Sequence, residues 1–485
     1  MPPLVPPREP RSVTLPPRTA TVEGSCDVLV VGGGPAGLGA ALGAAAAGAE
    51  VILTERYGFL GGNATAALVM PLMAFHTQRG APAPGRAGEL MPQDHGPGDP
   101  VVRGALATML ERLVAAGGAM PASEQTGFVV PFDPEVMKLV ALDLLDEAGV
   151  KFLFHALATG VTGAPRPTGV VFATKSGPIV VESRGTVDCT GDGDVAAFAG
   201  APFEVGRDHD ARVQPMTLMF RMVEFQRAAF AAYHREHPDQ WLGVHGLWDL
   251  IREATAAGEL DLPREDILFF GTPHDEEVSV NSTRIGDALG ISVWDLTRAE
   301  WQARRQMRQI VAFLRRYVPG FEQAYVVQSG VTIGVRETRR ILGAYQLTAD
   351  DVLQARKWDD VIARGTYPID IHNPAGKGTI IRRVPPGDAY DIPLRCLLPR
   401  QVEQLLVAGR CISGTHEAHS SYRVMATAMA TGQAAGVCAA LAARSGRPPR
   451  DVPAPEVQDE LRRQGAALGP SRPSVREGAP GRTMP

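Results

Sequence analysis

The sequence contains few cysteines, and their spacing argues against several kinds of site. Only 5 of the 485 residues are cysteine, they are scattered along the chain, and no two of them form a C-x-x-C pair. This pattern argues against a disulfide framework, a redox-active dithiol and a local iron–sulfur or zinc cluster. We therefore expect no bound metal, and we expect thiols that are buried in a reducing compartment.

The sequence also lacks an excess of positive charge and a targeting segment. Its 48 Lys and Arg residues face 53 Asp and Glu residues, which gives a formal net charge of −5. Nucleic acid and anionic membrane surfaces are therefore not expected as partners. The proline-rich segment 1–24 has no apolar core, as a secretory signal would, and no uninterrupted apolar run looks long enough to span a membrane. We expect a cytoplasmic protein with a disordered leader over residues 1–24.

A strand–turn–helix–strand pattern is present between Cys26 and Arg56, in CDVLVVGGGPAGLGAALGAAAAGAEVILTER. The first glycine of its G-x-G-x-x-G motif permits a tight turn, the second leaves room for a pyrophosphate, and the third lets the helix pack closely on the strand. Glu55 lies near the roughly 20-residue offset at which an acid binds an adenosine ribose. The predicted dinucleotide-binding residues are Gly32, Gly34, Pro35, Ala36, Gly37 and Glu55.

A second glycine pair follows this unit at Gly61 and Gly62, in RYGFLGGNAT. Backbone without side chains can again approach a phosphate there. The E-R…G-G pattern resembles the FAD site of flavoproteins related to succinate dehydrogenase, fumarate reductase and thiazole synthase, whereas nicotinamide-binding domains usually lack it. We therefore predict FAD as the cofactor and add Arg56, Gly61 and Gly62 to its contacts.

The rest of the chain changes character twice. After residue 205 the alternation of helix and strand patterns gives way to aromatic residues and charged helices, and at 402–408 an apolar strand returns before a small-residue helix. We predict the first part of an FAD-binding domain over 25–205, an inserted α+β substrate domain over 206–394, and the second part of the FAD-binding domain over 395–445. Residues 446–485 are predicted to form a short helix and a disordered tail.

Several blocks along the chain together resemble the FAD-dependent oxidoreductase family, whose distant relatives include the flavin core of the heterodisulfide reductases. Besides the first motif, the blocks are VDCTGDGDVAAFAGAPFE, GVRETRRILGAYQLTADDV, YPIDIHNP, YDIPLRCLLP and LLVAGRCISGTHEAHSSYRVMATAMATGQAAG. They span nearly the whole chain from Cys26 to Ala440. The resemblance implies an α/β fold, with a Rossmann-like FAD-binding domain built on a parallel sheet with a β-rich crossover. It implies no particular substrate.

The same resemblance implies that residues 409–433 form the second half of the flavin site. A strand, a glycine turn and a helix N-terminus meet the flavin in the related proteins, which here correspond to Gly409, Arg410, Arg423 and Val424. A helix that begins near Arg423 would direct its free N–H groups at the flavin. Asp192 in CTGDGD is a further candidate contact, with a local Asx turn as the alternative explanation.

Two histidines in THEAH, His416 and His419, are candidates for proton transfer beside the flavin. Their pKa near neutrality suits a group that exchanges a proton during hydride transfer. Structural hydrogen bonding within the turn is the alternative for each. Their spacing does not match the zinc-protease motif, which needs histidines four residues apart.

The arginines of GVRETRRILG form another candidate group. On a helix, Arg336, Arg339 and Arg340 would share one face, and clustered guanidinium groups favour an anion such as a substrate carboxylate. A structural network of salt bridges with Glu337 and Asp350 or Asp351 is the alternative. His372 in PIDIHNP and Arg395 in YDIPLR lie in segments that the resemblance places near the mouth of the active site, and Asn281 to Arg284 is a further candidate for binding substrate or flavin.

These features predict an FAD-dependent oxidoreductase that transfers a hydride between flavin N5 and a small organic substrate, for which a carboxylate is one option. His372 or His419 would take the proton, and Arg336 or Arg339 would orient the substrate. An electron-transfer component of a larger complex and an FAD protein without net redox chemistry remain alternatives. The expected partners are the substrate and an unidentified electron acceptor, and a homo-oligomer is left open.

Overall fold

The central sheet is largely parallel, as the first motif predicts. The computed structural model describes residues 6, 12–78, 90–92, 98–374 and 378–470. The strand order is β3-β2-β1-β6-β5-β4, and β18 also pairs with β6. The strands are β1 (Thr21–Val31), β2 (Val51–Thr54), β3 (Lys151–Leu153), β4 (Leu157–Thr162), β5 (Gly169–Thr174), β6 (Gly177–Asp188) and β18 (Leu405–Val407). Strand β5 pairs antiparallel with both β4 and β6, and β4 and β5 form the predicted β-rich crossover from β3 to β6.

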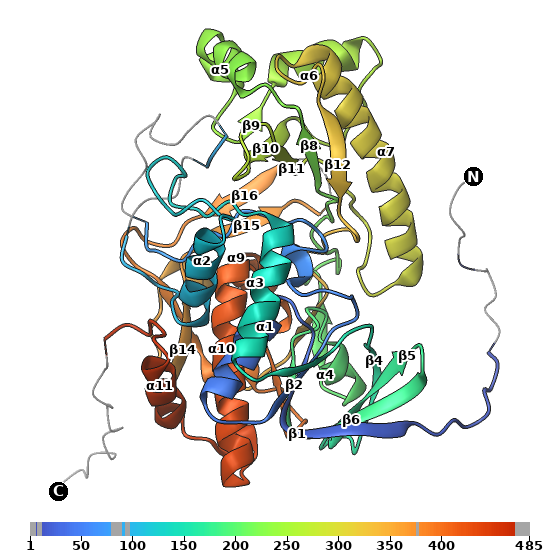
Figure 1. The fold of residues 1–485 in the computed structure, drawn as a ribbon, viewed down its shortest axis with the longest axis vertical. Helices are drawn as coiled ribbons and strands as arrows, with labels where there is room; N and C mark the ends of the chain where they lie inside the picture. Colours follow the sequence, from blue (N-terminus) through green and yellow to red (C-terminus); the bar gives the residue numbers. More distant parts are fainter. Residues whose placement is uncertain (1–5, 7–11, 79–89, 93–97, 375–377, 471–485) are drawn as a thin grey trace, which may run out of the picture.

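Two helices built from small residues pack closely against each other beside this sheet (Figure 1). They are α1 (Pro35–Ala46) and α10 (Met425–Ser445). A Cβ atom on Gly432 would lie 1.9 Å from the carbonyl oxygen of Ala36, and one on Gly436 would lie 2.0 Å from that of Ala40. Because no larger residue fits at these positions, the small side chains of α10 hold the two halves of the FAD-binding domain together.

Helix α10 is an exception to the expectation that no segment is long and apolar enough to span a membrane. By length and composition it could cross a membrane, since its most apolar segment has a mean hydropathy of 1.3. However, 89% of that segment is buried inside the protein. Its apolar residues therefore form part of the protein core. Glycine and threonine interrupt the apolar run, so the sequence does not show one continuous apolar stretch of this length.

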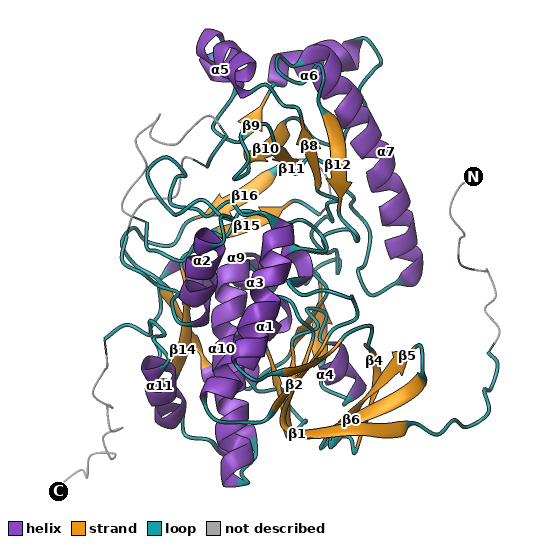
Figure 2. Ribbon diagram, in the orientation of Figure 1, coloured by secondary structure: helices purple, strands orange, loops and turns teal. Residues whose placement is uncertain are grey.

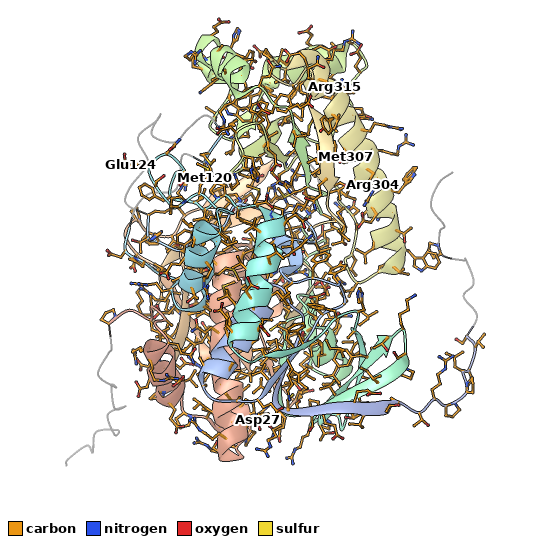
Figure 3. All side chains as sticks on the ribbon, viewed as in Figure 1. Asp27, Met120, Glu124, Arg304, Met307 and Arg315 are labelled. Atoms are coloured by element: carbon orange, nitrogen blue, oxygen red, sulfur yellow. The ribbon has the colours of Figure 1, made fainter. Side chains whose placement is uncertain are left out.

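A second lobe lies at the top of Figure 2. It has its own hydrophobic core. Its sheet has the order β12-β8-β11-β10-β9. The strands are β8 (Phe220–Val223), β9 (His245–Gly246), β10 (Ile267–Gly271), β11 (Val278–Val280) and β12 (Tyr325–Ser329), and the helices are α5 (Arg227–Glu236), α6 (Trp248–Ala256) and α7 (Val293–Tyr317). Figure 3 shows Arg304, Met307 and Arg315 along α7, of which Met307 packs on two apolar clusters.

Strands β7 (Phe203–Val205) and β13 (Arg339–Ile341) pair antiparallel, so the segments before and after the second lobe lie side by side. The segment between β13 and residue 394 contains α8 (Ala349–Leu353), β14 (Val361–Gly365), β15 (Ile369–His372), β16 (Thr379–Arg382) and β17 (Tyr390–Pro393). Its residues Ile362 and Ile392 pack in the main core. The boundary of the inserted domain at residue 394 stays a prediction.

Asp133, the N-cap of α3 (Pro134–Glu147), forms contacts with the second lobe. Asp133 caps this helix by accepting a hydrogen bond from the N–H of Glu135. The same carboxylate accepts from His274 Nε2 at 2.8 Å and lies 3.4 Å from Arg221 of the second lobe. The remaining helices of the FAD-binding domain are α2 (Ala105–Ala115), α4 (Asp194–Phe198), α9 (His416–Tyr422) and α11 (Ala454–Arg463).

The predicted ends of the domain need one correction. The leader predicted over 1–24 is too long, because residues 21–24 already belong to β1, where Thr21 pairs with Ile179 of β6. Residues 1–5 and 7–11 of that leader, and residues 471–485 of the predicted tail, lie outside the described residues. The short helix predicted within residues 446–485 corresponds to α11.

Candidate active site

The first of two adjoining cavities opens where the parallel strands of the main sheet end. Val31 and Thr54 are the last residues of β1 and β2, and Cys189 and Ala408 directly follow β6 and β18; all four line this cavity. Its empty space, part of which is open to solvent, is about 1020 Å³. Open α/β sheets bind their ligands at this edge.

Two backbone turns meet on one wall of the first cavity. Gly34 is the N-cap of α1 and has no side-chain cap, and the first N–H groups of a helix have no partner within it. The N–H of Gly61 donates to the carbonyl of Gly33 at 2.8 Å, which fixes the second turn against the first. Gly34 and Gly62 both line the cavity, so this wall is bare backbone that suits a phosphate.

Glu55 lies on the same wall and is held by two backbone amides. Its Oε2 accepts from the N–H of Gly33 at 2.7 Å, and its Oε1 accepts from the N–H of Tyr57 at 3.0 Å. The side chain is buried, and this burial raises the pKa of its carboxyl in spite of the two donors. Glu55 therefore supports the glycine turn as well as facing the cavity. Beside it, the buried hydroxyl of Thr54 has no hydrogen-bond partner in the described part of the chain.

Helix α10 begins where the first cavity adjoins the second. Val424 is its N-cap, without a side-chain hydrogen bond, so the helix starts close to the predicted position. Asn63, Arg410, Arg423 and Met425 line both cavities. A group bound between these four side chains would therefore be accessible from the first cavity and from the second.

Arginines from three segments line the second cavity, which encloses about 1110 Å³. Arg264 is paired with Asp266 at 3.0 Å, and Nη2 of Arg423 lies 3.7 Å from Oδ2 of Asp370. Apolar side chains also line this cavity, among them Val69, Met70, Pro71, Met73, Met219, Leu268 and Phe270. The cavity can therefore hold a molecule with an anionic end and an apolar body.

Arg336 is the cation of this cavity without a carboxylate partner among the described residues. Its Nη1 donates to the carbonyl of Pro215 at 2.7 Å and to the hydroxyl of Thr217 at 2.6 Å. Burial and the neighbouring charge of Arg423 lower the pKa of Arg336 to about 9. The guanidinium is thus still charged at neutral pH, and an anion bound beside it would offset the repulsion from Arg423.

His372 lies in the same cavity, at the end of β15. Its Nε2 is 3.7 Å from Oδ2 of Asp370, which accepts a hydrogen bond from the hydroxyl of Tyr367 at 2.9 Å. Burial, and then the positive charges of Arg336 and Arg423, lower the pKa of His372 well below its ordinary value. The imidazole is therefore neutral at pH 7, which is the form that can accept a proton.

A protein-family model described as FAD dependent oxidoreductase matches residues 27–461. The chain belongs to the FAD dependent oxidoreductase family. This match confirms the resemblance inferred from the sequence blocks and FAD as the cofactor. A search of curated proteins finds no match.

Solved structures similar to this FAD dependent oxidoreductase have low sequence identity. A geranylgeranyl bacteriochlorophyll reductase-like protein from Thermoplasma acidophilum has 13% identity and a TM-score of 0.42, covering 90% of this chain and 83% of that chain. A p-nitrophenol 4-monooxygenase from Pseudomonas putida has 10% identity and a TM-score of 0.44, covering 91% and 89%. A flavin-dependent brominase has 11% identity and a TM-score of 0.45, and the match covers 91% of this chain and 84% of that chain. Similarity at this level says nothing about the substrate.

The residues around the first cavity fit FAD. The bare backbone at Gly34 and Gly62 would hold the pyrophosphate. Glu55 and the unpartnered hydroxyl of Thr54 lie on the wall where the adenosine ribose would bind. Arg410 and the start of α10 would meet the flavin at the junction with the second cavity. Asp192, predicted as a flavin contact, is not among the residues that line the first cavity, and its Oδ1 accepts a hydrogen bond from Nη2 of Arg410 at 2.8 Å.

Replacing Gly34 with alanine is expected to weaken FAD binding by about tenfold to thirtyfold without unfolding the protein. The added Cβ would lie 3.6 Å from the Cα of Gly62, an ordinary contact, so the apoprotein can accommodate it. The methyl group would nevertheless occupy the wall that a pyrophosphate must approach. Dissociation constants for FAD, measured by titrating apoprotein, test this.

Gly24→Ala is the matched control for that titration. Gly24 lies in β1 outside the first cavity, and an added Cβ would lie 3.5 Å from the nearest atom, the Cδ1 of Ile52. Its affinity for FAD should equal that of the wild type. Equal affinities for all three proteins would show that the glycine turn does not contact the cofactor.

The predicted helical face of arginines does not exist. Residues 336–338 belong to no helix or strand, and Arg339 and Arg340 belong to strand β13, where neighbouring side chains point to opposite faces. Arg339 pairs with Asp194 at 2.7 Å, and the buried Arg340 pairs with Glu337 at 2.6 Å. Only Arg336 reaches the second cavity. The salt-bridge alternative therefore holds for Arg340, and Arg339 is not in a position to orient a substrate in this cavity.

His416 and His419 lie in the protein interior, outside the walls of both cavities. His416 Nδ1 is 2.9 Å from Oε1 of Glu337, so the structural alternative describes it. His419 is fully buried on α9, and burial lowers its pKa well below the ordinary value. Neither residue is therefore placed to exchange a proton with a molecule bound in either cavity, whereas His372 does line the second cavity.

Several residues of the second cavity had weak or no sequence signals. Asn281 carried a weak signal in NSTR, and Asp370 stands two residues before His372 in a block of the family resemblance. Tyr367 is the first residue of the same block, whereas Arg264 stands in no recognisable motif. Arg395, the remaining candidate, lies outside both cavity walls and pairs with Asp360 at 2.8 Å. In the part of the chain that the structure describes, no cluster of His, Cys, Asp or Glu is arranged to hold a metal.

Proposed function

We propose that this flavoprotein oxidises a small organic monoanion bound in the second cavity, by hydride transfer to FAD. The observation that carries this proposal is the charge of Arg336. The other cavity arginines face acids, Arg264 at Asp266, Arg410 at Asp192 and Arg423 near Asp370. One guanidinium without a carboxylate partner among the described residues favours a ligand with one negative charge.

The chain's own residues would bind, orient and deprotonate this substrate. Arg336 would hold the carboxylate with the donors that Pro215 and Thr217 leave unused, while the apolar side chains around Met70 and Phe270 exclude water from the body of the substrate. The neutral imidazole of His372 would accept the proton at a ring nitrogen. FAD, when bound, supplies the acceptor for the hydride, which carries both electrons.

Titration of the FAD-loaded protein with benzoate and with benzamide tests the charge requirement. Benzoate is expected to bind and to shift the visible spectrum of the flavin, and benzamide, which has the same shape but no charge, is expected to bind at least about tenfold more weakly. Equal affinities, or no binding of benzoate, would contradict the proposal. Anaerobic screening of carboxylates for flavin reduction, with their esters as uncharged controls, then identifies the substrate.

A further inference from the structure

We infer that the substrate is a 2-hydroxy acid and that Asn281 recognises its hydroxyl group. The inference rests on the proposed function, because it specifies the anion that binds in the second cavity. It starts from two buried polar atoms of that cavity that have no hydrogen-bond partner among the described residues, the side-chain oxygen of Asn281 and Nε of Arg423.

Buried polar atoms without partners are costly, because they lose their hydrogen bonds to water and gain nothing in return. Asn281 is fixed in place, since its N–H donates to the carbonyl of Leu268 at 2.8 Å and its own carbonyl accepts from Nη1 of Arg264 at 3.1 Å. These bonds hold the main chain of Asn281 at the wall of the second cavity, which this residue lines. A ligand that supplies a hydrogen-bonding group there would recover the lost interaction.

A hydroxyl group fits this position better than the other small polar groups. It can donate to the amide oxygen of Asn281, and it can also accept if the amide is turned over. An ammonium group could only donate, and it would be repelled by Arg264, Arg336 and Arg423 in the same cavity. The cavity therefore favours a hydroxy acid over an amino acid.

The position of the hydroxyl follows from the groups that must act on it. Arg336, which would hold the carboxylate, and His372, which would take the proton, both line the second cavity. The carbon that is oxidised must therefore be near the carboxylate. Oxidation would break the C–H bond of that carbon and the O–H bond of its hydroxyl, and the C–O single bond would become the carbonyl of a 2-oxo acid. His372 would take the hydroxyl proton, and bound FAD would supply the acceptor for the hydride.

Two inert acids test the recognition of the hydroxyl. In 2-hydroxy-2-phenylpropanoate the carbon that bears the hydroxyl has no hydrogen, so it cannot transfer a hydride, and 2-methyl-2-phenylpropanoate replaces the hydroxyl with a methyl group of similar size. We expect the FAD-loaded protein to bind the hydroxy acid about tenfold more tightly, as measured by the shift of the flavin spectrum or by calorimetry.

Asn281→Leu completes a cycle of two ligands and two proteins, which isolates the contact between the hydroxyl and the amide. The preference for the hydroxy acid should fall to less than about twofold in this variant, while the methyl analogue binds at least as tightly as before. Retained FAD content and an unchanged melting temperature show that the variant is folded; if it does not fold, the ligand pair on the wild type decides alone.

The outcomes separate this inference from the function on which it rests. Binding of both acids with equal affinity by the wild type, or a preference that persists in Asn281→Leu, would overturn the role of Asn281 and leave the anionic substrate standing. Failure of both acids to bind would instead contradict the anionic substrate itself, and the inference with it.

Discussion

Replacing His372 with glutamine is expected to slow the reduction of bound flavin by the substrate about 100-fold to 10,000-fold, the usual range for loss of a general acid–base group. His372 lies in the wall of the second cavity beside Asp370, and the nearby charges of Arg336 and Arg423 keep its imidazole neutral. Glutamine retains polarity but cannot take up the proton. Anaerobic stopped-flow measurement of the reduction rate at saturating substrate tests this expectation.

The matched control is His209→Gln. His209 has a side chain that is 70% exposed and lies outside both cavities, so its replacement should leave the reduction rate unchanged. A loss of less than about threefold in His372→Gln would contradict the assignment of His372 as the proton acceptor, because such a change is well below the contribution of a general base.

The pH dependence distinguishes a proton acceptor from a merely structural residue. Because the pKa of His372 is lowered in the folded protein, its basic form persists well below pH 6.5, and the reduction rate should stay constant between about pH 6 and 8. The rate should fall only at a more acidic pH, where the imidazole becomes protonated. In His372→Gln this acidic limb should disappear.

Replacing Arg336 with methionine is expected to weaken binding of the substrate or of benzoate about 100-fold to 1,000-fold, since loss of one partner from a partly buried charge pair costs about 2–5 kcal/mol. FAD content should not change, because Arg336 lines the second cavity and not the first. The structure also predicts no loss of stability from ion pairing, because Arg336 has no carboxylate partner among the described residues. Equilibrium titration of the flavin spectrum measures the affinity.

Two further variants define what the guanidinium contributes. Arg336→Lys keeps the charge but loses the planar pair of donors, and it should recover only part of the affinity. Arg395→Met removes an arginine whose side chain is 43% exposed and which pairs with Asp360 outside both cavities, so it should bind benzoate normally. If Arg336→Met bound benzoate as tightly as the wild type, the anion would have to bind elsewhere.

The FAD-binding half of the molecule could be predicted from the sequence because its determinants are local. Gly32, Gly34 and Glu55 stand within one strand–helix–strand unit, and their roles depend on short backbone turns. The start of α10 was predictable for a similar reason, since small residues at helical spacing identify a closely packed helix. In both cases neighbouring residues in the chain are also neighbours in the site.

The second cavity could not be predicted in the same way, because it is assembled from distant segments. Arg264, Arg336 and Asp370 come from three parts of the chain, and no local pattern records that they meet. The arginines of GVRETRRILG also have a helical spacing, but tertiary pairing with β7 makes Arg339 and Arg340 part of a strand. Pairing of the two strands outweighs the helical spacing in the sequence. Two of the three arginines therefore form ion pairs with acids of the protein and do not line the second cavity.

The most direct test of the account is a crystal structure of the FAD-loaded protein with 2-hydroxy-2-phenylpropanoate. We predict that the pyrophosphate lies against the backbone at Gly34 and Gly62, that the flavin ring lies at the junction formed by Arg410 and Met425, and that the carboxylate of the ligand accepts hydrogen bonds from Arg336. A dinucleotide bound away from the glycine turns, or a carboxylate that does not contact Arg336, would contradict it.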